Sequence, residues 1–65
     1  MMRLSETTIL DLIGKKQGIT LTEITEELGL KKANASNTLR FLYEKGLIIR
    51  KFDEDDMKKK IYYKA

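Results

Sequence analysis

The chain has 65 residues, 42% hydrophobic and 35% charged, with a formal net charge of +3 and neither cysteine nor histidine. A chain of this length forms a single domain near the lower size limit for independent folding, and without Cys or His it builds neither a disulfide nor the usual zinc site. The same lack removes the common nucleophile–base pairs, so we expect no enzymatic activity, no metal site and no cofactor.

The charges are segregated along the chain. Residues 1–30 carry three basic and five acidic side chains, residues 31–51 carry six basic and one acidic, and residues 52–65 carry four of each. The net charges of these parts are therefore −2, +5 and zero. A positive field concentrated in one segment is typical of proteins that bind a polyanion, although basic patches are also common on small soluble domains.

The sequence contains no run of 18 apolar residues and no signal-peptide pattern at its N-terminus. We therefore expect no membrane partner and a cytoplasmic location.

Two helices are predicted in the first half of the chain. The first spans about residues 5–17, with Ser5 as N-cap and an apolar stripe that includes Ile9 and Ile13. The second spans about 21–28, because Thr20 and Glu23 have the spacing of a capping box directly before an apolar pattern. The residues just before it are β-prone, so a short strand is expected there.

A third helix is predicted over about residues 32–45. Gly29 is suited to end the preceding helix, and Gly46 to end this one. Ala35, Leu39 and Leu42 recur at helical spacing and form its predicted buried face. On the helical wheel Phe41 lies away from that face; we expect it to pack under the following hairpin, with a dimer contact or a thymine methyl as alternatives. Tyr43 lies at the edge of the core, with its ring expected to be buried.

Residues 47–64 read as a hairpin, because two apolar and β-branched runs flank a polar stretch. Alternation along the strands predicts that inward-facing residues come from Leu47, Ile49, Ile61 and Tyr63. The residues predicted to face outward are Arg50, Lys60 and Lys64.

The turn Leu28-Gly-Leu30, placed a fixed distance before Leu39-x-x-Leu42 and Gly46-Leu-Ile48, resembles winged helix-turn-helix transcriptional regulators of the multiple-antibiotic-resistance and arsenic-repressor (MarR and ArsR) type. The resemblance covers roughly the whole chain. It implies an α+β fold for residues 1–65: three helices, a short strand and a C-terminal β-hairpin, the wing. Two positions differ from the family pattern. Thr25 stands where Ala is usual, and Lys31 stands where a capping Ser or Thr is usual.

The third helix is identified as the DNA recognition helix. Its open face carries amide, hydroxyl and cationic groups rather than the Glu–Lys pairs of a merely soluble helix. Asn37 and Arg40, then Asn34, are the candidates for base edges, and Lys31, Lys32 and Ser36 are better suited to phosphates. The plainer alternatives are an intrahelical pair between Arg40 and Glu44 and a solvated amide at Asn37.

The wing carries four acidic residues, Asp53 to Asp56, shortly before Lys58, Lys59 and Lys60. We expect these lysines to contact the DNA backbone or the minor groove while the acids face solvent. The alternative is a self-neutralising flexible loop.

The sequence therefore predicts a small transcriptional regulator that binds double-stranded DNA sequence-specifically, with the third helix in the major groove. The alternative is a winged helix that serves as a protein-interaction or assembly module. A palindromic site would need two copies, and a weak or DNA-assisted homodimer is expected. No small-molecule effector is evident, since the metal-sensing residues of arsenic-repressor relatives, Cys and His, are absent.

Overall fold

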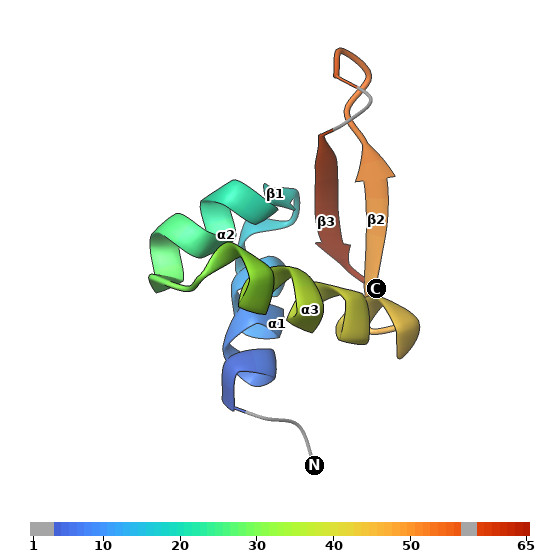
Figure 1. Ribbon diagram of the computed structural model, residues 1–65. Coiled ribbons are helices and arrows are strands. Elements are labelled where there is room, and N and C mark those ends of the chain that lie inside the picture. The colour runs from blue at the N-terminus through green and yellow to red at the C-terminus, as the bar shows by residue number, and fades with distance from the viewer. Residues whose placement is uncertain (1–3, 57–58) are drawn as a thin grey trace.

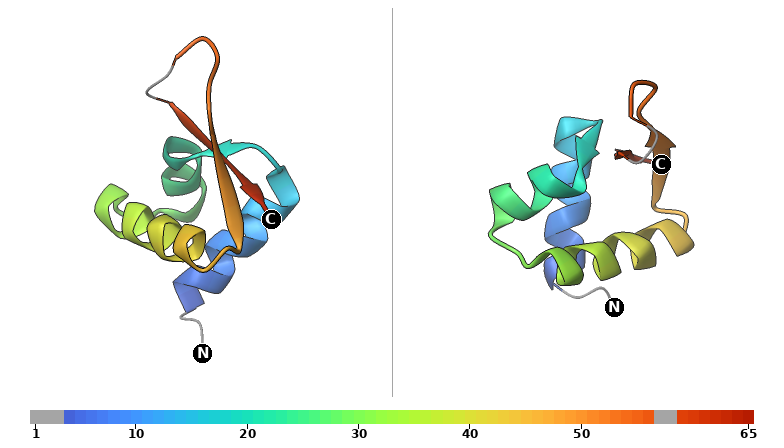
Figure 2. Two further views of the ribbon diagram at one scale, coloured as in Figure 1. Left: turned by 90° about the vertical axis from the view of Figure 1, so that its right-hand side faces the viewer. Right: turned by 45° about the horizontal axis from the view of Figure 1, so that its top comes forward.

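The computed structural model describes residues 4–56 and 59–65 (Figure 1). In chain order the elements are α1 (Leu4–Lys16), β1 (Ile19–Thr20), α2 (Leu21–Leu28), α3 (Lys32–Glu44), β2 (Ile48–Phe52) and β3 (Lys60–Lys64). α3 crosses α1, and the hairpin of β2 and β3 starts next to the end of α3 and projects beyond the helices (Figures 1 and 2). These elements confirm the predicted winged helix-turn-helix fold.

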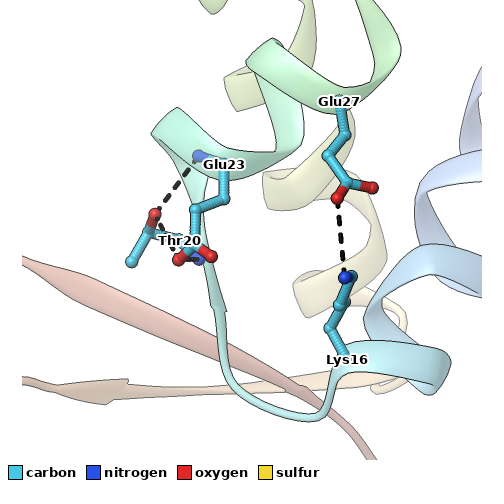
Figure 3. Close-up of polar contacts among 4 residues, drawn as sticks. All are labelled: Lys16, Thr20, Glu23 and Glu27. Carbon is cyan, nitrogen blue, oxygen red and sulfur yellow. Dashed lines mark hydrogen bonds and ion pairs between the residues drawn. The ribbon is translucent and has the colours of Figure 1, made fainter.

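Side-chain contacts fix the start of α2 and join it to α1 (Figure 3). The Glu23 backbone N–H donates to Thr20 Oγ1 at 3.3 Å, and the Thr20 backbone N–H donates to Glu23 Oε1 at 3.3 Å. This is the predicted capping box, in which each residue satisfies a free amide of the other. Nearby, Lys16 Nζ lies 3.5 Å from Glu27 Oε1, so an ion pair links the end of α1 to α2.

The turn between α2 and α3 depends on Gly29. This residue ends α2 in the left-handed conformation, with φ of 64°, and its N–H donates to the Thr25 carbonyl. The Thr25 hydroxyl donates to the Thr22 carbonyl at 2.8 Å. The hydroxyl that Thr has and the more usual Ala lacks is therefore hydrogen-bonded. Lys31 is the N-cap of α3 and makes no side-chain cap, as its chemistry predicts.

The sheet has the strand order β1-β3-β2, and both pairs of strands are antiparallel. Tyr62 in the central strand pairs with Ile19 of β1 on one side and with Arg50 of β2 on the other. The two residues of β1 thus attach the hairpin to the helical part of the molecule.

One apolar core lies where the three helices meet the sheet. The predicted α3 residues Ala35, Leu39 and Leu42 are all buried there. The other buried apolar residues are Ile9, Leu12, Ile13, Ile19, Ile24, Ile48 and Tyr62. The helical spacing in the sequence therefore identified the face of α3 that packs inward.

The predicted alternation of the hairpin is wrong by one residue. Ile48 and Tyr62 are the buried residues of β2 and β3, whereas Ile49 is 43% exposed. The reason lies in the end of α3, where the Leu47 N–H donates to the Leu42 carbonyl at 3.0 Å. Leu47 belongs to this closing turn, so Ile48 is the first strand residue and points into the core. The others predicted to face inward are half-buried: Leu47, Ile61 and Tyr63.

This shift also moves the charged residues of the hairpin. Arg50 and Lys60, predicted to face outward, share the sheet face of Ile48 and Tyr62 and lie beside α3. Lys64 is on the same face, and its Cδ lies 3.3 Å from where a Cβ on Gly14 would be. All three side chains are exposed, as predicted, but they project from the sheet face that also carries the core residues instead of from the opposite face.

Both aromatic residues of the second half of α3 are more exposed than predicted. Tyr43, expected to have a buried ring, is 43% exposed, because its ring faces a groove between α3 and the strands instead of the apolar core. Phe41 is 37% exposed, and Lys45 Nζ lies 5.5 Å from its ring centre. The expectation that Phe41 is covered by the hairpin is therefore wrong.

None of the helices formed by residues 4–56 and 59–65 is long and apolar enough to cross a membrane.

Candidate nucleic-acid interface

The N-terminal half of α3 presents a polar, basic face to solvent. Every site residue predicted in this segment is exposed: Lys31, Lys32, Asn34, Ser36, Asn37 and Arg40. Their exposure follows from the burial of Ala35 and Leu39 on the opposite face. No acidic residue occurs in the first turn of α3, so the face carries positive charge at its start.

A groove of about 340 Å³ separates α3 from the hairpin; we call it the wing groove. From α3 it is lined by Ser36, Leu39, Arg40 and Tyr43, and from the strands by Arg50, Lys60 and Tyr62. Three of these side chains are cationic and none is acidic. The wing groove therefore brings together three predicted site residues: Ser36 and Arg40 of α3 and Lys60 of the wing.

Arg50 is held in the wing groove by two tyrosines. Its guanidinium carbon lies 4.6 Å from the centre of the Tyr43 ring, a cation–π contact. The guanidinium also interacts with Tyr62, its partner in the strand pairing. Burial raises the pKa of the Tyr62 hydroxyl, while the charge of Arg50 and its hydrogen bond partly oppose the rise. Tyr62 is therefore a neutral hydroxyl beside a fixed cation at neutral pH.

A second groove, of about 260 Å³, adjoins the first near the starts of α2 and α3. It shares Ser36, Lys60 and Tyr62 with the wing groove, and it adds two further predicted site residues, Lys32 and Lys59. Lys32 and Arg40 of α3 thus line two adjoining grooves together with Lys59 and Lys60 of the wing.

Asn34 and Asn37 lie on another side of α3. Together with Ser5, Leu30 and Thr38 they line a hollow between α3 and the start of α1. The structure does not bring these two amides together with the wing lysines. The predicted base-reading residues therefore divide between the flank near α1 and the flank near the wing.

Arg40 makes the alternative contact that the sequence allowed. Its Nε lies 3.5 Å from Glu44 Oε1, one helical turn away, and the two side chains are 80% and 67% exposed. Exposed pairs of this kind contribute only about 0.3 to 0.5 kcal/mol. A stronger anionic partner would therefore displace Glu44 at little cost.

The acidic part of the wing forms a hydrogen-bonded turn. The Asp55 N–H donates to Asp53 Oδ1 at 2.8 Å, and the Asp53 N–H donates to the Lys59 carbonyl at 2.9 Å. Lys59 and Lys60 are exposed, and Lys58 lies outside the described residues.

The sequence analysis did not predict three polar residues of the wing groove as site residues: Tyr43, Arg50 and Tyr62. The available signal was the pair Ile48-Ile49, since assigning Ile48 to the core puts Arg50 on the helix side of the sheet. Within the described residues no group of three His, Cys, Asp or Glu side chains could hold a metal ion.

Comparison with known proteins identifies the family. The MarR family model matches residues 2–60. FabT of Streptococcus pneumoniae, solved in complex with DNA, is 25% identical with a TM-score of 0.93, and the match covers 98% of this chain and 45% of FabT. MepR of S. aureus, in a MepR–DNA complex, is 27% identical with a TM-score of 0.91, and the match covers 98% of this chain and 53% of MepR.

The chain thus spans about half the length of the solved structures it resembles. Among curated protein sequences, none matches it significantly. The family match extends over most of the chain: it includes α1, β1, α2, α3 and β2 and ends at Lys60, the first residue of β3. The chain therefore belongs to the MarR family of winged helix-turn-helix transcriptional regulators, which are not enzymes.

Proposed function

We propose that this chain binds double-stranded DNA sequence-specifically as the DNA-binding domain of a transcriptional regulator. In this proposal the N-terminal half of α3 enters the major groove and the wing contacts the backbone or the minor groove. Asn37 and Arg40, with Asn34, contact base edges, while Lys31, Lys32, Ser36 and the wing lysines contact phosphates. Such a role would place the protein in the cytoplasm.

The observation that carries this proposal is the exposed polar surface of α3. On one flank, Lys32 and Arg40 line grooves together with the described lysines of the wing, and on the other flank lie the amides of Asn34 and Asn37. The segment 31–51, which contains α3 and most of β2, has a net charge of +5, and this favours binding to a polyanion. FabT and MepR, which share the fold at 25% and 27% identity, were each solved with DNA. These relatives support double-stranded DNA as the partner of this chain.

The test of base reading compares two DNAs. A preferred duplex is first selected from a random pool, and binding is then measured on it and on random duplex. We expect Asn37→Ala and Arg40→Ala each to cost about 1 to 3 kcal/mol on the preferred duplex and little on the random one. Lys15→Ala on α1 removes one charge outside both basic grooves and serves as the control. Equal losses on both DNAs would show that these residues do not read bases.

The test of the wing uses Lys58, Lys59 and Lys60 replaced together by Gln. We expect affinity for both DNAs to fall alike. We also expect the slope of log K against log salt to decrease by roughly 0.9 for each phosphate that the wing no longer neutralises. A triple variant with the affinity and slope of the parent would exclude the wing lysines from the interface.

We further propose that two copies bind a palindromic site as a weak or DNA-assisted homodimer. Two recognition helices that read successive major grooves must be about 34 Å apart. Sedimentation of the protein alone and on the selected duplex measures the stoichiometry. One copy per site would contradict this part of the proposal.

The competing function is a protein-interaction or assembly module, which the exposed ring of Phe41 favours. The same titrations distinguish the two. A parent protein that binds neither duplex at low salt would favour the protein-interaction function, whereas sequence-selective binding excludes it as the main role.

A further inference from the structure

We propose that the wing groove binds one phosphodiester of the DNA backbone through the guanidinium groups of Arg50 and Arg40. This site rests on the proposed function and adds to it a residue, Arg50, that belongs to neither the reading face of α3 nor the lysines of the wing.

The position of the groove is the first reason. If α3 occupies the major groove and the hairpin reaches the neighbouring minor groove, the strand that separates these two grooves must pass between α3 and the hairpin. The wing groove lies there, with Ser36 and Arg40 on one wall and Arg50 and Lys60 on the other. The second basic groove continues it past Lys60 towards Lys32. The backbone would therefore meet cationic side chains along its path.

The preorganisation of Arg50 is the second reason. Its guanidinium lies over the Tyr43 ring at 4.6 Å and beside Tyr62. A guanidinium held against an aromatic ring loses less conformational freedom when it binds an anion, and its planar edge matches two phosphate oxygens. Arg50 takes part in neither ion pair found among the described residues, so its charge is not neutralised there.

The rest of the lining supports an anion. Lys60 adds a third positive charge, and the hydroxyls of Tyr43 and Tyr62 can donate to phosphate oxygens. Glu44, which pairs with Arg40, does so through an exposed contact that a phosphate can replace. Charge-assisted, bidentate hydrogen bonds of Arg to phosphate are among the stronger polar contacts in proteins.

The test combines a protein variant with DNA that has one phosphate made neutral. The duplex selected by the parent is prepared as a series, each member carrying a single methylphosphonate at a different position. We expect one position at which the parent loses about tenfold or more in affinity, as for a charged hydrogen bond. Arg50→Gln should lose a similar factor in affinity on the unmodified duplex. A methylphosphonate at the sensitive position should then weaken the binding of Arg50→Gln little further.

Lys51→Gln is the matched control. Lys51 follows Arg50 in β2 and carries the same charge, but it lies on the other sheet face, where its Nζ is 5.4 Å from the Tyr63 ring centre. Arg50→Gln should lower the salt slope by about 0.9, and Lys51→Gln should leave it nearly unchanged. Equal effects of the two variants would overturn the proposal, because they would reflect overall charge alone.

A further variant tests the proposal even if Arg50→Gln does not fold. Arg50→Lys keeps the charge but not the planar fork, so it should keep the salt slope of the parent and lose part of the affinity. Circular dichroism confirms that each variant is folded. If Arg50→Gln does not fold, the Arg50→Lys variant is the test. The bidentate contact would be contradicted if Arg50→Lys bound the unmodified duplex as tightly as the parent and lost as much affinity as the parent at the sensitive methylphosphonate.

Free anions are tested separately. NMR signals of the arginine Nε–H groups are followed during titration with inorganic phosphate and with the duplex. Shifts of the Arg50 signal with the duplex at far lower concentration than with inorganic phosphate support the proposal. A groove that takes inorganic phosphate and is unaffected by bound DNA is a free-anion site, which overturns it. Failure of the parent to bind any duplex would instead refute the proposed function, and the phosphodiester site with it.

Discussion

The ring of Tyr63 lies against Gly18, so that a Cβ added at Gly18 would be 3.2 Å from Tyr63 Cε1. Gly18 has a φ of +117°, which disfavours other residues, and its N–H donates to the Tyr62 carbonyl at 3.1 Å. A glycine here lets the turn between α1 and β1 approach the central strand closely.

We predict that Gly18→Ala lowers the free energy of unfolding by about 1 to 3 kcal/mol, because it combines backbone strain with a side-chain contact that is too tight. Gly29→Ala is the matched control, since Gly29 has a φ of +64° and no atom within 4 Å of the added Cβ. Urea unfolding of both variants measures the difference. A loss at Gly18 no larger than that at Gly29 would show that the contact with Tyr63 adds nothing.

Leu39 is 1% exposed at the centre of the core, so we expect Leu39→Ala to cost about 2 to 5 kcal/mol. That is a large part of the total stability of a small domain. Asn37→Ala, an exposed position on the same helix, should change stability by less than about 0.5 kcal/mol. Thermal melts compare the two, and a Leu39→Ala variant that melts with the parent would contradict the packing of α3.

Lys31 occupies the N-cap of α3 with φ of −70° and ψ of 143°, the extended conformation of capping residues, but its side chain makes no cap. We predict that Lys31→Ser stabilises the protein by about 0.5 to 2 kcal/mol, because the hydroxyl can accept from a free amide of the first turn. The same change removes a cation from the proposed DNA surface and should weaken binding. Chemical unfolding and a DNA titration of the same variant test both effects. A variant with parental affinity would remove Lys31 from the interface.

The pKa of Tyr62 is raised by burial above its ordinary value of 10.0, partly offset by Arg50. Its neutral form is therefore favoured more in the folded than in the unfolded state. The resulting contribution to stability is fully present below pH 10 and is lost as the pH rises through the folded-state pKa. We predict that the stability of the parent falls more steeply above pH 10 than that of Tyr62→Phe. Unfolding curves between pH 8 and 11 check this, and parallel pH profiles would contradict it.

Local chemistry predicted the helical part of the fold, and long-range packing decided the rest. The capping box of Thr20 and Glu23 and the spacing of Leu39 and Leu42 depend on neighbours within one or two helical turns, so the sequence revealed them. The alternation of the hairpin was not decidable in this way, because Ile48 and Ile49 are equally suited to the core.

The same ambiguity hid part of the candidate site. The polar face of α3 follows from its helical pattern and was predicted residue by residue. The position of Arg50 and its contact with the Tyr43 ring depend on which face of the hairpin meets α3. Both are set by packing between segments distant in sequence.

Thr20 takes part in two structures at once. Its backbone pairs with Ile61 in the sheet, and its side chain caps α2 without any loop between. Thr20 is therefore a direct covalent link between the sheet and α2, which packs against α3, in addition to the contacts of β3 with α1 and of β2 with α3. In the proposed complex we therefore expect DNA that bends around the wing to displace the start of α2 together with β3, because Thr20 belongs to both.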